Sequence, residues 1–435
     1  MDILSCQEAF GAGDITTAAM GRAIAQWFDL YYRADTKNGE DPCQRIAYTA
    51  VSRVVRTVFA EYGFRCDDPF GKRIMEALCQ KKETAMQLAL VGGEVYLKPW
   101  VTEKETEISL IPRDQILIFG RNPHGEPTDV GTLEKSVRGS RYYTLLERRR
   151  VDEKGYLTIE NRLFRSTAAE LLGKEVSLKD HPLYEALPRQ YTYRKPVGSV
   201  GLVRVATPML NCVDGSADGV SLYAPAVGLI HAIDRNEFLL REEFERGQSR
   251  VFASSDLLRQ GQLADNLFVG LEDDPERIGL TVYAPQLRQE AFLERKREYL
   301  RNVESVIGLK RGLLSNVNSQ RYTATEIDSS AADQTLTVLD FQRMWDKAVK
   351  KTLALCACLG ELYGIRESAV AEVFQDWGNG TLYEEDKLWQ DYKDMVSQGI
   401  LKPEVALGWR FHMPVDTPEA LARIRETLMP SDGKS

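Results

Sequence analysis

The longest uninterrupted helical pattern in the chain starts at Thr323 and runs to Gly360 without a proline or an internal glycine. It opens with Thr323-Ala-Thr-Glu326, a capping box in which the Thr323 hydroxyl accepts from the Glu326 amide and the Glu326 side chain reaches back to the Thr323 amide. Apolar residues then recur at three- and four-residue steps or their multiples: Ile327, Ala331, Val338, Phe341, Trp345 and Ala348. Almost forty residues at about 1.5 Å each predict a helix of roughly 55 Å.

A helix of this length exceeds what an ordinary globular domain needs, and periodic runs beyond about 25 residues are typical of coiled coils, membrane spans or assembly elements. Charged residues along the run exclude the membrane span. They are Asp328, Asp333, Asp340, Arg343, Asp346, Lys347, Lys350 and Lys351. The charges change from acidic to basic along the run, as the helix dipole favours.

Two shorter helical patterns precede the long one and enclose a region of strand and turn signals. The first spans 222–246, with Pro225 tolerated in its first turn and Gly247 ending it. The second spans 289–307, and the loop 308–322 then leads into the long helix. Short β-type runs in the enclosed region predict a small β-containing insert. These runs lie at 250–253, 267–269 and 280–283.

The first half of the chain changes from helical to strand periodicity, which predicts an α+β fold class. Helical patterns cover 19–28, 44–63 and 70–91. Strand patterns follow at 94–100, 107–112, 115–119, 142–147 and 156–164. Two short helices are predicted after Gly364, at 388–398 and 418–429. In the second, Thr417 is placed as the N-cap and Pro418 as the first helical residue.

Length, composition and charge narrow the possible functions. The 435 residues, 43% of them hydrophobic, suffice for two or three domains with real cores. We expect a soluble protein, because the sequence has neither a signal-peptide pattern nor an apolar run of membrane-spanning length. The formal net charge of −8 argues against a tight, general nucleic-acid binder, which would usually be basic. It does not argue against a surface that DNA slides past.

Few patterns point to catalysis, a metal or a cofactor. The seven cysteines are odd in number and irregularly spaced, which fits reduced thiols, and Cys356 and Cys358 point in different directions on a helix. The four histidines are far apart, and the C-terminal Gly433-Lys434-Ser435 lacks the first glycine, the strand and the helix of a phosphate-binding loop. We therefore expect no enzyme, no metal and no cofactor; an unrecognised enzyme is the alternative.

The order of these patterns resembles the portal proteins of tailed bacteriophages, the head-to-tail connectors, particularly those of siphophages that infect Gram-positive bacteria. The resemblance begins with the glycine-containing loop before the Thr-Ala-Thr-Glu capping box and spans about residues 40–400. Its other motifs are the helix–turn–strand segment 89–98, the Ile-Pro-Arg-Asp-Gln segment 111–115, the strand pair at 142–164 and the stretch 208–245.

This resemblance implies a portal-like α+β subunit with an α/β wing, a helical stem, a small β-containing clip, a long kinked or straight helix and a small helical crown. The implied parts are the wing 1–220, the stem helix 221–248, the clip 249–287, the second stem helix 288–307, the tunnel loop 308–322, the long wing-to-crown helix 323–362 and the crown and tail 363–435. On the residues alone, an ordinary helical hairpin in an α+β domain is the alternative.

The function implied by the resemblance is mechanical. Portal subunits form a ring, here expected to be dodecameric, which assembles in the host cytoplasm and occupies one capsid vertex of the virion. The ring is the channel for DNA packaging and ejection, and it docks the terminase and the head-completion or adaptor proteins. Further implied partners are the major capsid and scaffolding proteins and double-stranded DNA in transit, without sequence-specific contacts and without a membrane. A minor capsid or adaptor protein without a channel is the alternative.

The resemblance also implies candidate site residues. The tunnel loop would contain Lys310, Arg311, Asn316, Asn318 and Arg321, and its cations would touch DNA phosphates transiently. The alternative is an ordinary solvated loop.

Contacts between subunits have four candidate residues. Phe341 and Trp345 would be anchors, because buried aromatic residues tend to dominate interfaces. A core position within one subunit is their alternative. Arg148 and Arg150, which continue a strand, are candidates for salt bridges between subunits.

Overall fold

The structure is a computed structural model that describes residues 3–32, 43–102, 105–247, 250–254, 268–271, 281–283, 286–315, 324–365, 373–378, 385–411, 413, 415 and 417–429. Two compact units divide the chain. Unit 1 consists of Met1–Ala60 and Arg65–Phe374, and unit 2 of Glu61–Phe64 and Gln375–Ser435. Helices and antiparallel sheets are both present, which confirms the predicted α+β class.

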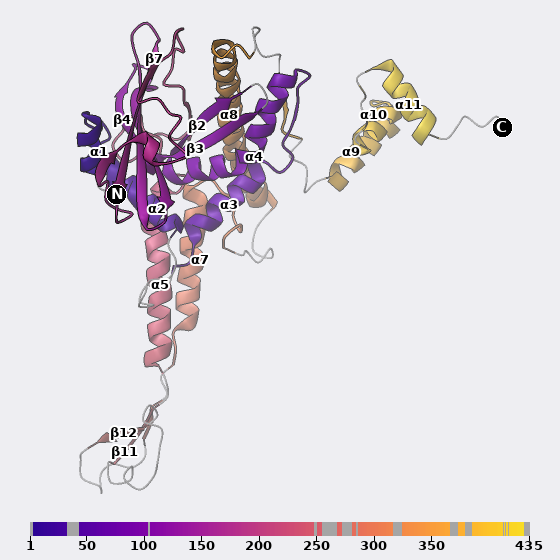
Figure 1. Ribbon diagram of the computed structural model, residues 1–435. Coiled ribbons are helices and arrows are strands. Elements are labelled where there is room, and N and C mark those ends of the chain that lie inside the picture. The colour runs from indigo at the N-terminus through magenta and orange to yellow at the C-terminus, as the bar shows by residue number, and fades with distance from the viewer. Residues whose placement is uncertain are drawn as a thin grey trace, which may run out of the picture. The chain divides into compact units, whose positions relative to one another are not determined.

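Four helices begin unit 1 (Figure 1): α1 (Ile3–Phe10), α2 (Ala18–Tyr32), α3 (Ile46–Val58) and α4 (Pro69–Gly92). The last three confirm the predicted helices, although α3 is shorter than its pattern. Helix α4 has clear stop and start signals: the Asp68 carboxylate accepts from the Gly71 amide at 2.7 Å, Pro69 stands at the first turn, and Gly93 takes a positive φ of 84° at the end.

Two antiparallel sheets follow. The smaller has the order β10-β2-β3, and both α4 and α8 pack on it. The larger has the order β4-β5-β6-β7-β8, with β9 also paired to β7. The strands are β2 (Glu94–Val101), β3 (Thr106–Pro112), β4 (Ile116–Arg121), β5 (Pro127–Arg138), β6 (Arg141–Val151), β7 (Leu157–Ser166), β8 (Lys174–Val176), β9 (Gln190–Thr192) and β10 (Val203–Ala206).

Helix α1 and strand β5 were both missed by the sequence analysis, and they are connected. Cys6 and Phe10 of α1 are buried in a core cluster with residues of the larger sheet, among them Leu133 of β5. A Cβ atom added to Gly131 of β5 would lie 2.7 Å from the Phe10 ring. The glycine that weakens the strand pattern therefore makes room for the ring of α1.

A helical hairpin leaves the sheet region of unit 1 (Figure 1). It consists of α5 (Val227–Arg246) and α7 (Gln289–Val306), which lie side by side. The predicted helix start at Leu222 was too early, because Ala224–Ala226 form a 3-10 turn around Pro225. Gly247 ends α5 as predicted. Between the two helices lie the short strands β11 (Arg250–Ser254), β12 (Phe268–Leu271) and β13 (Thr281–Tyr283), in the order β12-β11-β13, which confirms the β-containing insert.

The long helix α8 spans Ala324–Leu362, 39 residues, and confirms the length read from the sequence. The capping residue Thr323 lies outside the described residues. Phe341 and Trp345 are 2% and 1% exposed, and the Trp345 ring meets Phe59, the C-cap residue of α3, edge-on with ring centroids 5.5 Å apart. In the described part of α8, the apolar stripe therefore serves the core of unit 1.

Unit 2 contains three helices in its described part: α9 (Glu385–Ser397), α10 (Pro403–Arg410) and α11 (Pro418–Leu428). Thr417 caps α11 as predicted, accepting from the Ala420 amide at 3.2 Å. Helix α10 was missed, since no helix was predicted between 398 and 418; Pro403 stands in its first turn, where proline is tolerated. Strands β1 (Gly63–Arg65) and β14 (Phe374–Asp376) form a two-stranded sheet.

Candidate functional site

Polar cross-links join the two helices of the α5–α7 hairpin along its length. The Arg288 guanidinium contacts both carboxylate oxygens of Glu243, at 3.0 and 2.7 Å. Nearer the sheets, the Lys296 ammonium donates to Glu237 at 2.6 Å. The hydrogen bond to Arg288 lowers the pKa of the Glu243 carboxyl. The two ion pairs fix the register of α5 against α7.

Buried hydrogen bonds attach the base of the hairpin to α2, α4 and the segment before α3. The Tyr223 hydroxyl, just before α5, donates to the Trp27 carbonyl of α2 at 2.7 Å. Asp234 of α5 is 1% exposed and accepts from the Gln44 amide at 2.8 Å. The Ser221 hydroxyl donates to the Leu90 carbonyl of α4 at 3.0 Å. Helices α2 and α4 and the segment just before α3 therefore hold the first half of α5 and the residues that precede it.

A buried charge network lies just upstream of the hairpin, where β2, β4, β10 and the segment after β10 meet. Glu94 is fully buried and lies 2.6 Å from Arg204 Nε and 3.0 Å from Arg113 Nε. Asp218 accepts from Arg121 at 2.7 Å and from Arg113 at 3.1 Å. Burial would raise the pKa of the Glu94 carboxyl, but Arg204, Arg113 and Arg121 together lower it.

The same network reaches the long helix. Arg204 and Arg121 both donate to the Gly125 carbonyl in the β4–β5 turn, at 3.4 and 2.7 Å. The next residue of that turn, Glu126, accepts from Lys351 of α8 at 2.5 Å. The sheet region, α8 and the segment leading to α5 are thus tied through one turn.

The end of α7 is closed by a Schellman motif. Ile307 is the C-cap, and Gly308 follows with φ 69°. The Leu309 amide donates to the Glu304 carbonyl at 2.8 Å and the Gly308 amide to the Ser305 carbonyl at 3.4 Å. A Cβ atom added to Gly308 would lie 2.5 Å from the Thr337 hydroxyl of α8, so this turn sits directly against the long helix.

The residues after this turn wrap around the Glu304 side chain, which is fully buried. One carboxylate oxygen accepts from the amides of Leu314 and of Ser315, the latter at 2.9 Å. The other accepts from the Gly312 amide at 3.0 Å and from the Ser315 hydroxyl at 3.0 Å. Four donors from a four-residue stretch therefore converge on one carboxylate.

Of the predicted tunnel-loop residues, only Lys310 and Arg311 are described. They lie between the Schellman turn and the amides that bind Glu304; Lys310 is half-buried and Arg311 is exposed. Asn316, Asn318 and Arg321 lie outside the described residues. The sequence analysis missed Glu304, because nothing in its spacing marks a carboxylate that turns back onto the following loop.

Three of the four candidate residues for contacts between subunits contact residues of this chain. Phe341 and Trp345 are buried in unit 1, as their intrasubunit alternative requires. Arg148 on β6 forms a bidentate pair with Asp129 at 3.0 and 2.8 Å. Arg150 is exposed. Their contacts with a neighbouring subunit stay a prediction.

Between those two arginines, a buried triad links the sheets. Arg149 lies 2.6 Å from Glu147, and Lys98 of β2 lies 2.9 Å from the same carboxylate. Although burial alone would raise the pKa of Glu147, the two cations lower it to about 2. The sequence pattern showed only a charged strand end, because the strand pairing that brings Lys98 to Glu147 is not local.

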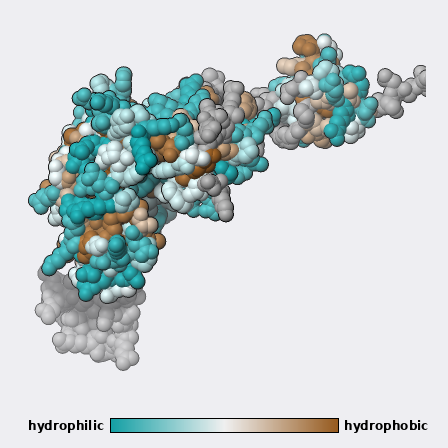
Figure 2. Space-filling view, turned by 45° about the horizontal axis from the view of Figure 1, so that its top comes forward, coloured by the Kyte–Doolittle hydropathy of each residue, from teal (hydrophilic) through white to brown (hydrophobic). Residues whose placement is uncertain are grey.

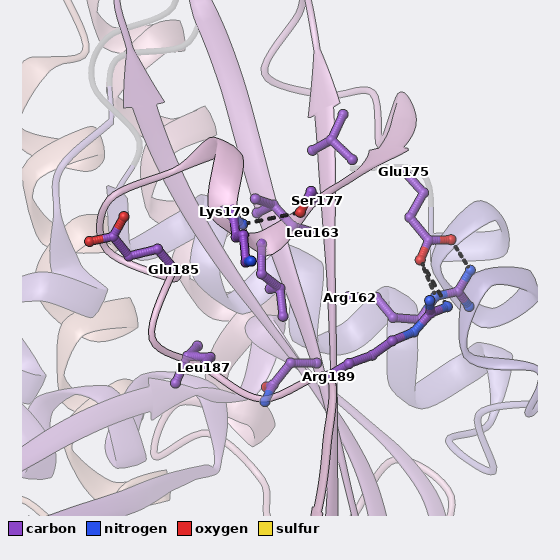
Figure 3. A pocket seen from close by; sticks show the side chains of 11 residues that line it. Arg162, Leu163, Glu175, Ser177, Lys179, Glu185, Leu187 and Arg189 are labelled. Carbon is purple, nitrogen blue, oxygen red and sulfur yellow. Dashed lines mark hydrogen bonds and ion pairs between the residues drawn. The ribbon is translucent and has the colours of Figure 1, made fainter.

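A pocket of about 260 Å³ lies beside β7 and β8 (Figure 3). The Glu175 carboxylate lies between the guanidinium groups of Arg162, at 2.5 Å, and Arg189, at 3.5 Å. Asn161 is 4% exposed and donates to the Pro188 carbonyl at 2.9 Å. The Arg162 side chain also donates to the Ala9 carbonyl of α1. These charges therefore hold α1 and the sheet edge together.

The described residues also bear on metal binding and on membrane insertion. They contain no group of three or more histidine, cysteine, aspartate or glutamate side chains that could hold a metal ion. No helix within them is long and apolar enough to cross a membrane. Cys356 is buried, which raises its thiol pKa to about 12.

No protein-family model matches this chain, and no curated protein matches its sequence significantly.

Proposed function

We propose that this chain is a portal protein: a subunit of a closed ring, expected to contain about twelve copies, at one vertex of a tailed-phage capsid. The observation that carries the proposal is the succession of an α+β body, an antiparallel helical hairpin that encloses a three-stranded insert, and a 39-residue helix. In the proposal these are the wing, the stem, the clip and the wing-to-crown helix, and unit 2 belongs to a small crown. No catalytic step is assigned to the chain.

The half of the hairpin that is nearer the insert supports this proposal. Large apolar side chains there remain exposed: Leu239 at 36% and Phe244 at 42% on α5, and Leu287 at 39% before α7. Figure 2 shows a largely hydrophilic face with several apolar areas on unit 1. In a ring, neighbouring hairpins would cover the three apolar side chains and add to the contacts that already join α5 to α7.

Charge supports a channel function. Each subunit carries a formal charge of −8, so a ring of identical subunits is strongly acidic. Release of counterions by basic groups is what binds proteins tightly to DNA. An acidic channel would instead repel phosphates and leave a low-friction passage, while Lys310 and Arg311 would supply brief contacts at the loop.

The proposal also assigns partners by position. The insert that carries β11, β12 and β13 would dock the terminase during packaging and the head-completion proteins afterwards. Nucleotide hydrolysis would belong to the terminase. The ring would assemble in the host cytoplasm with scaffolding and major capsid protein and then remain in the virion.

The mass of the purified particle tests the ring. Native mass spectrometry should give one species of about twelve or thirteen chains, and negative-stain images of the same sample should show a central hole. A monodisperse monomer or dimer at every salt and protein concentration would contradict the proposal and favour an adaptor or another minor capsid protein.

One substitution tests the hairpin contact. Phe244→Asp should lower the ring fraction at least tenfold, because it places a charge in the proposed interface, while the circular-dichroism spectrum stays native. Arg246→Asp, two residues further along α5 and exposed, is the matched control and should assemble with a much smaller loss. Equal assembly of the native and Phe244→Asp chains would remove the hairpin from the interface.

A further inference from the structure

The segment 308–315 is bound to the end of α7 by a side chain of that helix. Glu304 is three residues before the C-cap Ile307, and its main-chain carbonyl accepts from Leu309 while its carboxylate accepts from Gly312, Leu314 and Ser315. The backbone and the side chain of one residue thus hold both ends of the segment.

The chemistry of this contact is that of an anion held by a nest of amides. Successive backbone N–H groups that point to one centre form a concave site for negative charge. Here the anion is the chain's own carboxylate, which is fully buried and also receives the Ser315 hydroxyl. Gly312 has φ 88°, a conformation that other residues rarely adopt, and this turn aims its amide at the carboxylate.

Because the Glu304 carboxylate is buried, its hydrogen bonds favour one conformation of the segment 308–315. If the loop moved away, Glu304 would lose four hydrogen-bond donors together, and water would have to replace all of them. Gly308 is restrained on one side by the Schellman bonds and on the other by Thr337 of α8.

We infer that Glu304 is a positioning residue that makes residues 308–315 a rigid extension of α7 and thereby sets where Lys310 and Arg311 stand. Any displacement of α7 then moves both cations with it. What the cations meet rests on the proposed function: there, the partner is the phosphate backbone of double-stranded DNA passing through the ring.

Amide hydrogen exchange of the full-length protein tests the positioning role, in whatever oligomer it forms. In Glu304→Gln, one acceptor oxygen is replaced by a donor that faces the loop amides, so exchange in a peptide covering 312–315 should rise at least tenfold. Peptides from α3 and α4 should keep their native exchange. Glu298→Gln on the same helix, where the native side chain is 56% exposed, is the matched control and should leave 312–315 unchanged.

A second variant keeps the test decisive if Glu304→Gln unfolds. Ser315→Ala removes only the hydroxyl donor to Glu304 and should raise the exchange of 312–315 about two- to threefold. Native exchange at 312–315 in Glu304→Gln, or in Ser315→Ala when Glu304→Gln is unfolded, would overturn the positioning role.

Cross-linking to DNA separates this inference from the proposed function. With a short DNA duplex added to native rings, formaldehyde should link Lys310 to DNA. Rings of Glu304→Gln with unchanged mass should give several-fold less of that link. If exchange at 312–315 is faster in Glu304→Gln but the native ring gives no link between Lys310 and DNA, the positioning role of Glu304 is supported and the DNA contact is contradicted. If rings of Glu304→Gln give as much of the DNA link as native rings, the hydrogen bonds to Glu304 do not position Lys310.

Discussion

Two charged regions of unit 1 differ in where their charges lie. The network around Glu94 is in the core, with Glu94 fully buried and the Arg113 side chain 3% exposed. The pair that closes the free end of the α5–α7 hairpin is at the surface, with the Arg288 side chain 71% exposed. The buried network can fix how sheets, α8 and the hairpin base meet, whereas an exposed pair holds register with little free energy.

This difference shows that buried ion pairs fix the geometry of the sheet region within one chain, whereas the pair at the far end of the hairpin is more accessible to water. The sheet region pairs its buried charges within the chain, although it also leaves apolar side chains exposed, among them Trp100 at 55% and Val137 at 63%. The hairpin buries Ile233, Leu240 and Val303 but leaves Phe244 42% exposed near the insert. In the proposed ring, a neighbouring subunit would cover the Phe244 side chain.

The largest effect is expected from breaking the buried network. Glu94→Gln leaves Arg113, Arg121 and Arg204 with only Asp218 as a buried counter-charge, so the free energy of unfolding of unit 1 should fall by roughly 3–5 kcal/mol. Chemical denaturation measures this change. Glu107→Gln on β3 of the same sheet, where the side chain is exposed, should change it by less than about 0.5 kcal/mol. Equal effects of the two substitutions would show that the buried network does not carry the stability assigned to it.

The triad of Glu147, Lys98 and Arg149 should give unit 1 a distinct dependence on pH. The pKa of Glu147 falls from an ordinary 4.5 to about 2 in the fold. A lowered folded-state pKa stabilises the fold above the unfolded pKa, and that stabilisation disappears as the pH falls from about 4.5 to 2. The difference corresponds to on the order of 3 kcal/mol.

Glu147→Gln should therefore lower the free energy of unfolding near pH 7 and flatten its decline below pH 4.5. Denaturation at several pH values, compared with Glu160→Gln on the neighbouring strand β7, measures the difference. If the native chain and Glu147→Gln lose stability in parallel between pH 4.5 and 2, the carboxylate of Glu147 is not the group responsible.

The smallest effect is expected at the hairpin surface. Arg288→Ala should change the free energy of unfolding of the single chain by less than about 1 kcal/mol, because its partner Glu243 remains accessible to water. Arg241→Ala, which removes an exposed pair within α5, is the matched control. Differential scanning calorimetry at low salt compares them. If Arg288→Ala lowers the free energy of unfolding by more than about 2 kcal/mol, the expected difference between the hairpin pair and the buried network is contradicted.

The sequence carried the local part of the fold well. Uninterrupted apolar periodicity located α4, α7 and α8, because this signal lies within each helix. The sequence analysis missed elements that depend on packing between distant residues. Gly131 weakens the strand pattern of β5, and only the structure shows that it makes room for Phe10. Helix α10 was also missed, although Pro403 is tolerated in its first turn.

The residues of the candidate site also fall into those that the sequence indicated and those that it did not. Lys310 and Arg311 stand out in a loop sequence, but the Glu304 carboxylate that organises the loop has no local signature. The hairpin pairs Glu237–Lys296 and Glu243–Arg288 offered a usable signal. In each pair the two residue numbers lie at nearly equal distances on either side of the insert, as antiparallel helices require. The network around Glu94 joins residues more than one hundred positions apart, which no local pattern reports.

Imaging of the assembled particle by electron cryomicroscopy tests the central claim most directly. The expected result is a closed ring in which the α5–α7 hairpins surround a central channel and Lys310 faces its lumen. A closed assembly without a channel, or a channel lined by other elements with the hairpins on the outside, would contradict the account.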